Sequence, residues 1–317
     1  MSYSRSVPGW SSHTFFVSTF IYPHMDPPEA SEFDSISPSA RSLLFTKALT
    51  AIPFMKEAAE LISGEQGPHI ARERLASTKF ILRLIHFEIR YWSINEGLSA
   101  AGITNILEFS SGYSFRGLSL CENPDVHYVD TDLPQLMATK RILVEGLTKR
   151  YCSYPVDNLI MQELNVLDET SFADALRLLP PGPVAIVNEG LLMYLDEAQK
   201  RALCMIIHDL LGERGGCWIT ADIYLKKDQD ADPAGDLFED VGKEFLAEHH
   251  VEDNKFNNFE EAETFFSECG FTIQQKVEVP PDRVSSSKFL ETIPRSNLGG
   301  LKGRKKARET WIVVPEE

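Results

Sequence analysis

The chain has 317 residues, of which 43% are hydrophobic and 25% are charged, as in an ordinary globular protein. This length allows one large domain or two small ones around a sizeable hydrophobic core. The 31 Lys and Arg residues against 47 Asp and Glu residues give a net charge of −16, which argues against a nucleic-acid surface because phosphate binding needs a basic face. We therefore expect a small-molecule or protein substrate and no nucleic acid.

Cysteine spacing and hydropathy argue against a metal-binding, a membrane-spanning and a secreted protein. The five cysteines are widely separated and form no Cys-x-x-Cys pair, so we expect reduced thiols and no metal site. No apolar run reaches the about 18–20 residues of a membrane span. The run Ser11–Pro23 is too short and too interrupted by Ser and Thr for a secretory signal. We expect a cytoplasmic protein without a membrane partner; the sequence does not define its oligomeric state.

The first hundred residues predict helices rather than strands. Residues 1–34 are rich in Ser, Pro and aromatic residues without a clear period, and they predict an N-terminal arm. The segment 42–62 has a helical pattern, which Pro53 should bend or split. Apolar residues in 72–98 recur close to helical spacing. We predict that residues 35–100 form a helical cap.

From residue 103 onward, short apolar runs alternate with helical patterns. The five candidate strands are 103–109, 126–130, 159–166, 183–189 and 216–223. The three candidate crossover helices are 133–150, 171–179 and 197–211. Strands that alternate with helices are typical of parallel βαβ units. The sequence therefore predicts a doubly wound α/β sheet.

The C-terminal part departs from this alternation. A helix at 259–269 should end at Gly270, and the strand-like runs 271–279 and 309–315 follow with no helix between them. Two such runs should pair as an antiparallel hairpin. Five parallel strands with a terminal antiparallel hairpin are the layout of the class I methyltransferases. We predict this fold class, with a mostly parallel seven-stranded sheet, for a domain over residues 101–317.

Two charged segments interrupt the C-terminal part. Residues 228–268 are strongly acidic and predict a solvated insertion after the fifth strand. The segment Lys302–Arg308 is basic. We expect a solvated hairpin tip there, and a docking patch for an acidic partner is the alternative.

In a doubly wound sheet, ligands bind at the carboxyl ends of the strands. Acidic side chains gather there, because Glu108 ends the first strand, Asp130 and Asp132 the second, and Glu189 the fourth. Only Gly112 stands where a phosphate-binding loop has several glycines, and a rim of carboxylates repels a pyrophosphate. S-adenosylmethionine has no phosphate and carries a sulfonium cation. The pattern therefore favours it over a nicotinamide dinucleotide as the cofactor.

The segments ILEFSSGYSFRGLSL, YVDTDLPQLMATKRIL and VNEGLLMYLDEAQKRAL, in this order and spacing, resemble the leucine carboxyl methyltransferase family. SISPSARSLLFTKALTAIPF and FEIRYWSINEGL are similar to its polyketide-type O-methyltransferase branch. The resemblance covers residues 35–315, and its DLP-x(5)-K and NEG-x-x-MYL elements are specific in combination. It implies an S-adenosylmethionine-dependent O-methyltransferase that acts on a small-molecule carboxylate or phenol in specialised metabolism.

The resemblance also implies roles for residues around the methionine moiety of the cofactor. Arg90 resembles the arginine that pairs with the methionine carboxylate, for which a guanidinium offers bidentate geometry. Glu108 and Gly112 resemble the loop beneath this moiety, although the family often has a second glycine where the serines of the loop stand. Glu189 resembles the acid near the cofactor's amino group.

For the nucleoside half, Asp132 resembles the ribose-binding acid, with Asp130 as the alternative. Asn165 and Val166 resemble the pair beside the adenine, although the family usually has aspartate at the first position. Arg116 matches an arginine that either faces the substrate or braces the loop, and the sequence does not distinguish these roles.

The acceptor and the catalytic residue stay open. A carboxylate titrates near ~4 and needs no general base, whereas a phenol titrates near ~10 and does. The motifs place no histidine for that task, which favours a carboxylate. An anionic acceptor needs a positive pocket, and the candidates for it are Arg41, Lys47, Arg83 and Arg116. The alternatives are methylation of a protein C-terminal carboxylate and a non-methylating member that binds the cofactor.

Overall fold

The computed structural model describes residues 43–63, 72–226, 250–293 and 306–316. These residues belong to one compact unit, Phe33–Glu317. The predicted N-terminal arm, Arg41 and most of the predicted basic tip lie outside the described residues. Within the described ranges, no helix combines the length and the apolar character needed to cross a membrane.

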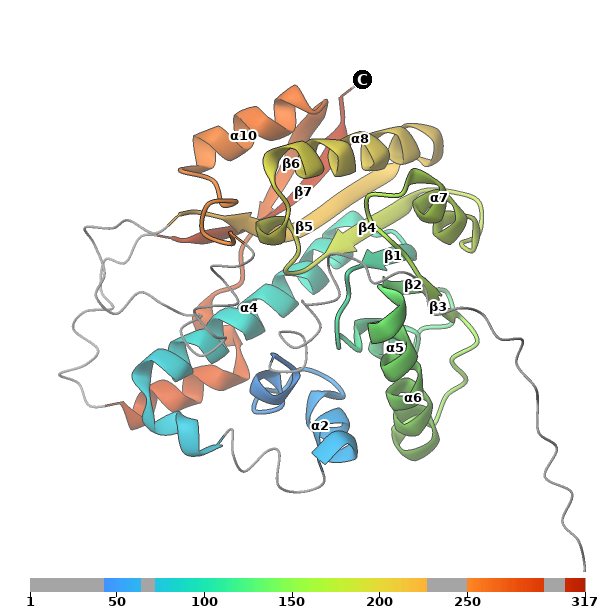
Figure 1. Ribbon diagram of the computed structural model, residues 1–317. Helices are drawn as coiled ribbons and strands as arrows, with labels where there is room; N and C mark the ends of the chain where they lie inside the picture. The colour runs from blue at the N-terminus through green and yellow to red at the C-terminus, as the bar shows by residue number, and fades with distance from the viewer. Residues whose placement is uncertain (1–42, 64–71, 227–249, 294–305, 317) are drawn as a thin grey trace, which may run out of the picture. The chain divides into compact units, whose positions relative to one another are not determined.

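The strands form one seven-stranded sheet in the order β3-β2-β1-β4-β5-β7-β6 (Figure 1). Their bounds are β1 Asn105–Phe109, β2 His127–Asp132, β3 Leu159–Glu163, β4 Val184–Asn188, β5 Gly216–Tyr224, β6 Phe271–Val277 and β7 Arg308–Pro315. Strands β1 to β5 pair in parallel, whereas β7 lies antiparallel between β5 and β6. This arrangement confirms the predicted class I methyltransferase fold, a doubly wound and mostly parallel sheet with an antiparallel end.

Helices cover both faces of the sheet. The α-helices are α2 Met55–Ser63, α4 Thr78–Ala101, α5 Arg116–Leu120, α6 Pro134–Tyr151, α7 Glu169–Arg177, α8 Glu197–Arg214 and α10 Phe259–Glu268. The 3₁₀ helices are η2 Arg74–Ala76, η3 Leu192–Tyr194, η4 Pro281–Arg283 and η5 Ser285–Thr292. Helices α4, α5 and α6 lie on one face, and α7, α8 and α10 on the other (Figure 1). Strands β1 and β4 are therefore buried along their whole length, which explains their continuous apolar runs.

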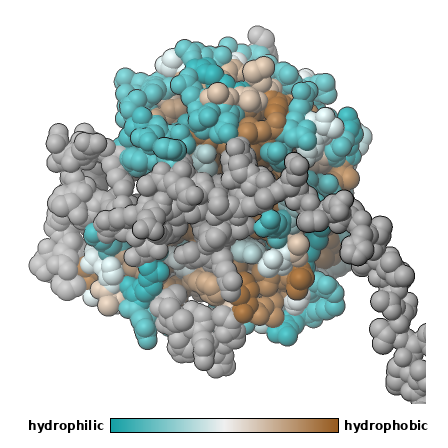
Figure 2. Space-filling model, viewed as in Figure 1, coloured by the Kyte–Doolittle hydropathy of each residue, from teal (hydrophilic) through white to brown (hydrophobic). Residues whose placement is uncertain are grey.

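Side-chain caps define where the helices next to the rim begin. The Asp196 carboxylate accepts a hydrogen bond from the Gln199 N–H, and Gln199 Oε1 accepts one from the Asp196 N–H, so that α8 starts with a capping box. The Asp168 side chain caps α7 by accepting from the backbone N–H groups of Thr170 and Ser171. The surface over α8 and α10 is mainly hydrophilic in the view of Figure 2. These helices thus present one apolar stripe to the sheet and a polar face to the outside.

Two segments differ from the sequence expectation. The predicted helix 42–62 is interrupted as Pro53 indicated: residues 43–47 are helical, and α2 begins only after the proline. The expectation of no helix between the last two strands was wrong, because η4 and η5 lie there. Short 3₁₀ segments carry no extended 3.6-residue period, so the apolar pattern gave no signal for them.

Candidate functional site

The sheet reverses its strand order at β1, which β2 and β4 flank in parallel. This switch point is where doubly wound sheets bind ligands. Glu189, directly after β4, binds three cations there. Its Oε1 accepts from Lys47 Nζ (2.5 Å) and Arg90 Nε (3.0 Å), and its Oε2 from Arg116 Nη2 (2.8 Å). The structure thus brings the predicted site residues Arg90 and Glu189 together, and adds Lys47.

Positive charges outnumber negative charges in this cluster. Burial alone would raise the pKa of Glu189, but the charges of Lys47, Arg90 and Arg116 outweigh burial and hold it well below the usual range. Glu189 is therefore ionised. The side chains of all four residues are at most 7% exposed. Three buried cations share this carboxylate, and among the residues that the structure describes only Arg116 has a second carboxylate partner, so these residues give the cluster a surplus of positive charge.

Arg116 braces the loop after β1. Its side chain is 0% exposed, and its Nε donates to Glu108 Oε1 at 3.3 Å. Its Nη1 donates to the Tyr91 carbonyl at 2.9 Å and to Asn95 Oδ1. The other oxygen of Glu108 accepts from the Tyr128 hydroxyl at 2.6 Å. Arg116 and Glu108 thus join the loop after β1 to α4 and to β2.

The two aspartates at the end of β2 have different partners. Asp130 Oδ1 accepts from Lys140 Nζ at 2.7 Å and from Ser111 Oγ at 2.5 Å, and Lys140 is 0% exposed. Lys140 Nζ also donates to Ser111 Oγ at 2.8 Å. The lysine of the DLP-x(5)-K element therefore ties β2 to the first loop. Asp130 is thus paired with a buried cation in the interior.

Asp132 holds the loop from the other side. Its two carboxylate oxygens accept one backbone N–H each, from Gly112 and from Leu133, both at 2.7 Å. Gly112 has a φ of 55°, and Ser110 also adopts a left-handed φ of 49°. A left-handed φ is the conformation that glycine adopts most easily, and the resembled family often has a glycine where the serines of this loop stand. Each oxygen of Asp132 keeps a second lone pair that can accept a further hydrogen bond.

Asn165 and Val166 follow β3 but do not point to the cluster. The exposed Asn165 side chain accepts from the Leu167 N–H at 3.1 Å and forms a local turn. The Val166 side chain is 5% exposed and packs in the hydrophobic core beneath α7 and α8. Their place at the carboxyl end of β3 is the predicted one, but neither side chain is charged.

Asp222 of β5 fixes the turn that carries Glu189, a role that the sequence did not indicate. Its carboxylate accepts from Asn188 Nδ2 at 2.7 Å and from the backbone N–H groups of residues 190–192 at 2.5, 2.6 and 3.2 Å. Gly190 has a φ of 91°, and a Cβ atom there would lie 3.2 Å from Arg90 Nη2. The glycine of the NEG element therefore allows the guanidinium to pass over the turn.

A histidine also reaches the rim, contrary to the sequence expectation. Arg90 Nη1 donates to the Tyr224 hydroxyl at 3.1 Å, and this hydroxyl lies 2.8 Å from His86 Nε2. A guanidinium only donates, so the tyrosine proton is directed to the imidazole. Burial, with the charges of Arg308 and Arg90, holds the pKa of His86 well below its ordinary value, so the ring is neutral and accepts. His86 lies four residues before Arg90 on the same helix, so this spacing in the sequence places both side chains on one face.

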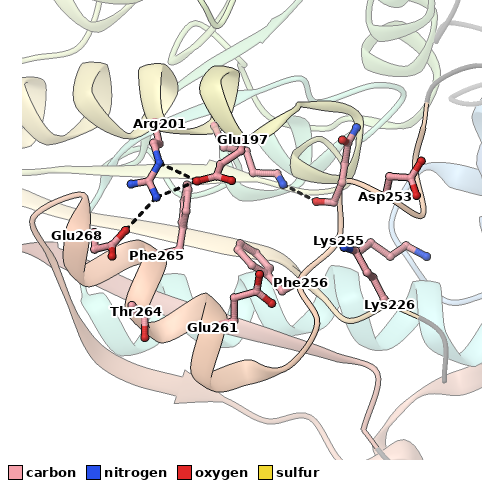
Figure 3. Close-up of a pocket in the computed structure, with 12 residues that line it drawn as sticks. Glu197, Arg201, Lys226, Asp253, Lys255, Phe256, Glu261, Thr264, Phe265 and Glu268 are labelled. Atoms are coloured by element: carbon pink, nitrogen blue, oxygen red, sulfur yellow. Dashed lines mark hydrogen bonds and ion pairs between the residues drawn. The ribbon is translucent and has the colours of Figure 1, made fainter.

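A cavity of about 580 Å³ lies outside this cluster, between α8, α10 and the segment around Phe256 (Figure 3). Arg201 binds Glu197 and Glu268 there, both at 2.9 Å. Lys200 is 6% exposed and donates to a backbone carbonyl, and burial lowers its pKa to about 8. None of the predicted site residues lines this cavity. We therefore place the candidate site at the switch point.

No protein-family model matches the sequence, and no curated protein matches it. Solved structures resemble it at low identity. A protein from Thermobifida fusca, provisionally assigned as a methyltransferase, is 18% identical over 80% of this chain and 89% of its own, with a TM-score of 0.47. An O-methyltransferase from neocarzinostatin biosynthesis, in complex with S-adenosylmethionine and 2-hydroxy-5-methyl naphthoic acid, is 12% identical over 89% and 70%, with a TM-score of 0.42. Such similarity shows no family, so membership of the leucine carboxyl methyltransferase family stays a prediction.

Proposed function

We propose that this protein is an S-adenosylmethionine-dependent O-methyltransferase that acts on a small-molecule carboxylate or phenol. The observation that carries the proposal is the cluster in which Lys47 and Arg90 meet Glu189 at the switch point. The methionine end of the cofactor is a zwitterion with a carboxylate and an ammonium group. Two cations beside a carboxylate match both of its charges, whereas a pyrophosphate is bound by donors and positive charge alone.

In this proposal, each predicted residue has a defined part. Arg90 and Lys47 hold the cofactor carboxylate, and Glu189 accepts from its ammonium group. Asp132 accepts from the ribose hydroxyls, because Asp130 is occupied by a buried lysine. The segment 165–166 flanks the adenine. Cofactor binding thus uses charges that the fold has already brought together.

Glu108 and Gly112 act through their neighbours. Glu108 fixes Arg116, and the Gly112 N–H orients Asp132. When bound, the cofactor supplies a methyl group to an oxygen nucleophile. Positioning and desolvation by the chain are worth up to about 7–11 kcal/mol in well-oriented systems. A carboxylate acceptor arrives ionised and needs no general base, whereas a phenol would need one.

The test is label transfer from methyl-labelled S-adenosylmethionine to a panel of aromatic acids and phenols. We expect a labelled ester or ether with the wild type and with the control Asp125→Asn, whose side chain is exposed. The Asp132→Asn variant should be at least about tenfold slower at limiting cofactor. Binding of S-adenosylhomocysteine without any labelled product would contradict the enzyme and leave a cofactor-binding protein.

A further inference from the structure

Arg308, at the start of β7, is a buried arginine without a carboxylate partner. It stands opposite Tyr224 in the β5–β7 pairing, so it lies at the carboxyl end of β5. The residue is 9% exposed, although it belongs to the basic segment expected to form a solvated tip. Its Nη1 donates to the Ala221 carbonyl at 3.1 Å and to Thr310 Oγ1 at 2.6 Å. Within the described residues, its Nε and Nη2 make no hydrogen bond and its charge makes no ion pair.

The other buried cations of the rim differ from Arg308 in this respect. Lys47 and Arg90 bind Glu189, Arg116 binds Glu189 and a second carboxylate, and Lys140 binds an aspartate. A buried charge is costly unless a counter-charge and hydrogen bonds compensate it. Among the described residues, Arg308 therefore keeps a charge without an ion-pair partner and two unused donor groups, whereas the neighbouring buried cations are paired.

The surroundings of Arg308 make this region more positive still. The Tyr224 hydroxyl accepts from Arg90 and contacts His86, which is uncharged. Besides burial, the charges of Arg308, Arg90 and Lys255 lower the pKa of His86, and that of Glu189 raises it. Glu189 already serves three cations. The charges of Asp222 and Glu189 also reach Arg308, but among the described residues no carboxylate forms an ion pair with its guanidinium.

We propose that Arg308 binds a carboxylate of the methyl acceptor through its free Nε and Nη2 groups, which makes this enzyme specific for small organic acids. The inference rests on the proposed function, since it assigns the acceptor side of the same rim. A guanidinium offers two parallel N–H groups that fit a carboxylate. One arginine matches one negative charge, and the net charge of −16 disfavours more highly charged anions.

The proposal is tested by calorimetric titration of the protein, saturated with S-adenosylhomocysteine, with benzoate and phenylacetate and with the uncharged benzamide and phenylacetamide. We expect each acid to bind the wild type at least about tenfold tighter than its amide. Arg308→Gln should lose this preference. Lys306→Gln, a control two residues away with a 44% exposed side chain, should keep it. Arg308→Lys retains the charge but lacks the paired N–H groups of a guanidinium, so its preference for acids should lie between those of the wild type and Arg308→Gln.

Two results would overturn the proposal: equal binding of acids and amides to the wild type, or an unchanged preference in Arg308→Gln. Failure of S-adenosylhomocysteine to bind the wild type would instead refute the proposed function, and the acid–amide comparison would then be made on the protein alone. The melting temperature is measured as well, because Arg308→Gln loses the hydrogen bonds to Ala221 and Thr310 and must be shown to fold.

Discussion

Asp130 and Asp132 stand two residues apart in β2, yet their carboxylates have different partners. Asp130→Asn would leave the ammonium group of Lys140, which is 0% exposed, without its counter-charge. We expect this variant to lose about 3–5 kcal/mol of unfolding free energy. Asp132→Asn keeps one of its two acceptor oxygens and should lose about 1–3 kcal/mol, but should bind S-adenosylhomocysteine at least about tenfold more weakly. Urea denaturation and calorimetry together separate the two, and a reversed pattern would make Asp130 the ribose acid.

His86 makes the stability of the protein depend on pH. Its pKa is held well below the ordinary value by burial and by the charges of Arg308, Arg90 and Lys255, against Glu189. The unfolded chain binds a proton below about 6.5 that the folded chain refuses, so the unfolding free energy falls as pH drops through this value. The slope for one such group is at most about 1.4 kcal/mol per pH unit.

His86→Gln should therefore flatten the loss of stability between about pH 6.5 and 5, measured by urea denaturation at several pH values. His250→Gln is the matched control, because the His250 side chain is 74% exposed. It should retain the wild-type slope. Identical slopes in all three proteins would mean that His86 protonates freely in the folded state.

Individual roles were the least predictable part of the site. The sequence placed Arg90, Glu108, Gly112, Asp132 and Glu189 at the rim, because each ends or follows a strand or belongs to a matching motif. Whether an arginine binds a ligand or another side chain depends on tertiary contacts. The buried partners of Arg116 and the isolation of Arg308, expected in a solvated tip, follow from neighbours that are distant in sequence and leave no local pattern.

At the scale of elements, Glu88 joins α4 to η5. This fully buried carboxylate accepts from the Ser285 N–H (3.0 Å), the Ser285 hydroxyl (2.7 Å) and the Ser286 N–H (2.8 Å). Glu88→Ala should lower the unfolding free energy by about 3 kcal/mol, because it leaves buried donors without a partner. Glu96→Ala, an exposed position on the same helix, should change it by less than about 0.5 kcal/mol. Equal losses would show that Glu88 contributes nothing specific.

The strands and most helices were predictable because their periods are local. Each of the seven predicted strands overlaps an observed one, and the bounds of α6, α8 and α10 differ from expectation by few residues. The exceptions have physical causes. Pro53 interrupted one helix as expected, whereas η5 depends on Glu88, a capping partner on another element that no local pattern reveals.

At the scale of the whole molecule, α4 belongs to the core of the sheet. Ile94 and Leu98 are at most 7% exposed and pack among side chains of the inner strands. At Gly97 a Cβ atom would lie 2.9 Å from Ile219 Cγ2, so the helix approaches the sheet closely. The predicted division between a cap at 35–100 and a methyltransferase domain at 101–317 stays a prediction, and this packing bears on it.

A fragment of residues 103–317 tests that division. We expect it to lack a cooperative thermal transition, since removing α4 exposes apolar side chains of the sheet at a cost of about 25 cal/mol per Å². Differential scanning calorimetry of the fragment beside the full chain is the measurement. A cooperative transition in the fragment would show that the sheet folds independently of the helix.

The measurement that tests the central claim most directly is calorimetric titration of the full chain with S-adenosylhomocysteine, with NADH in parallel. The account predicts micromolar binding of the first and none of the second. It also predicts that Arg90→Ala binds at least about tenfold more weakly, or about 1.4 kcal/mol, while Lys47 and Arg116 still compensate Glu189. Absence of S-adenosylhomocysteine binding, or unchanged affinity in Arg90→Ala, would contradict the assignment of the charged cluster as the cofactor site.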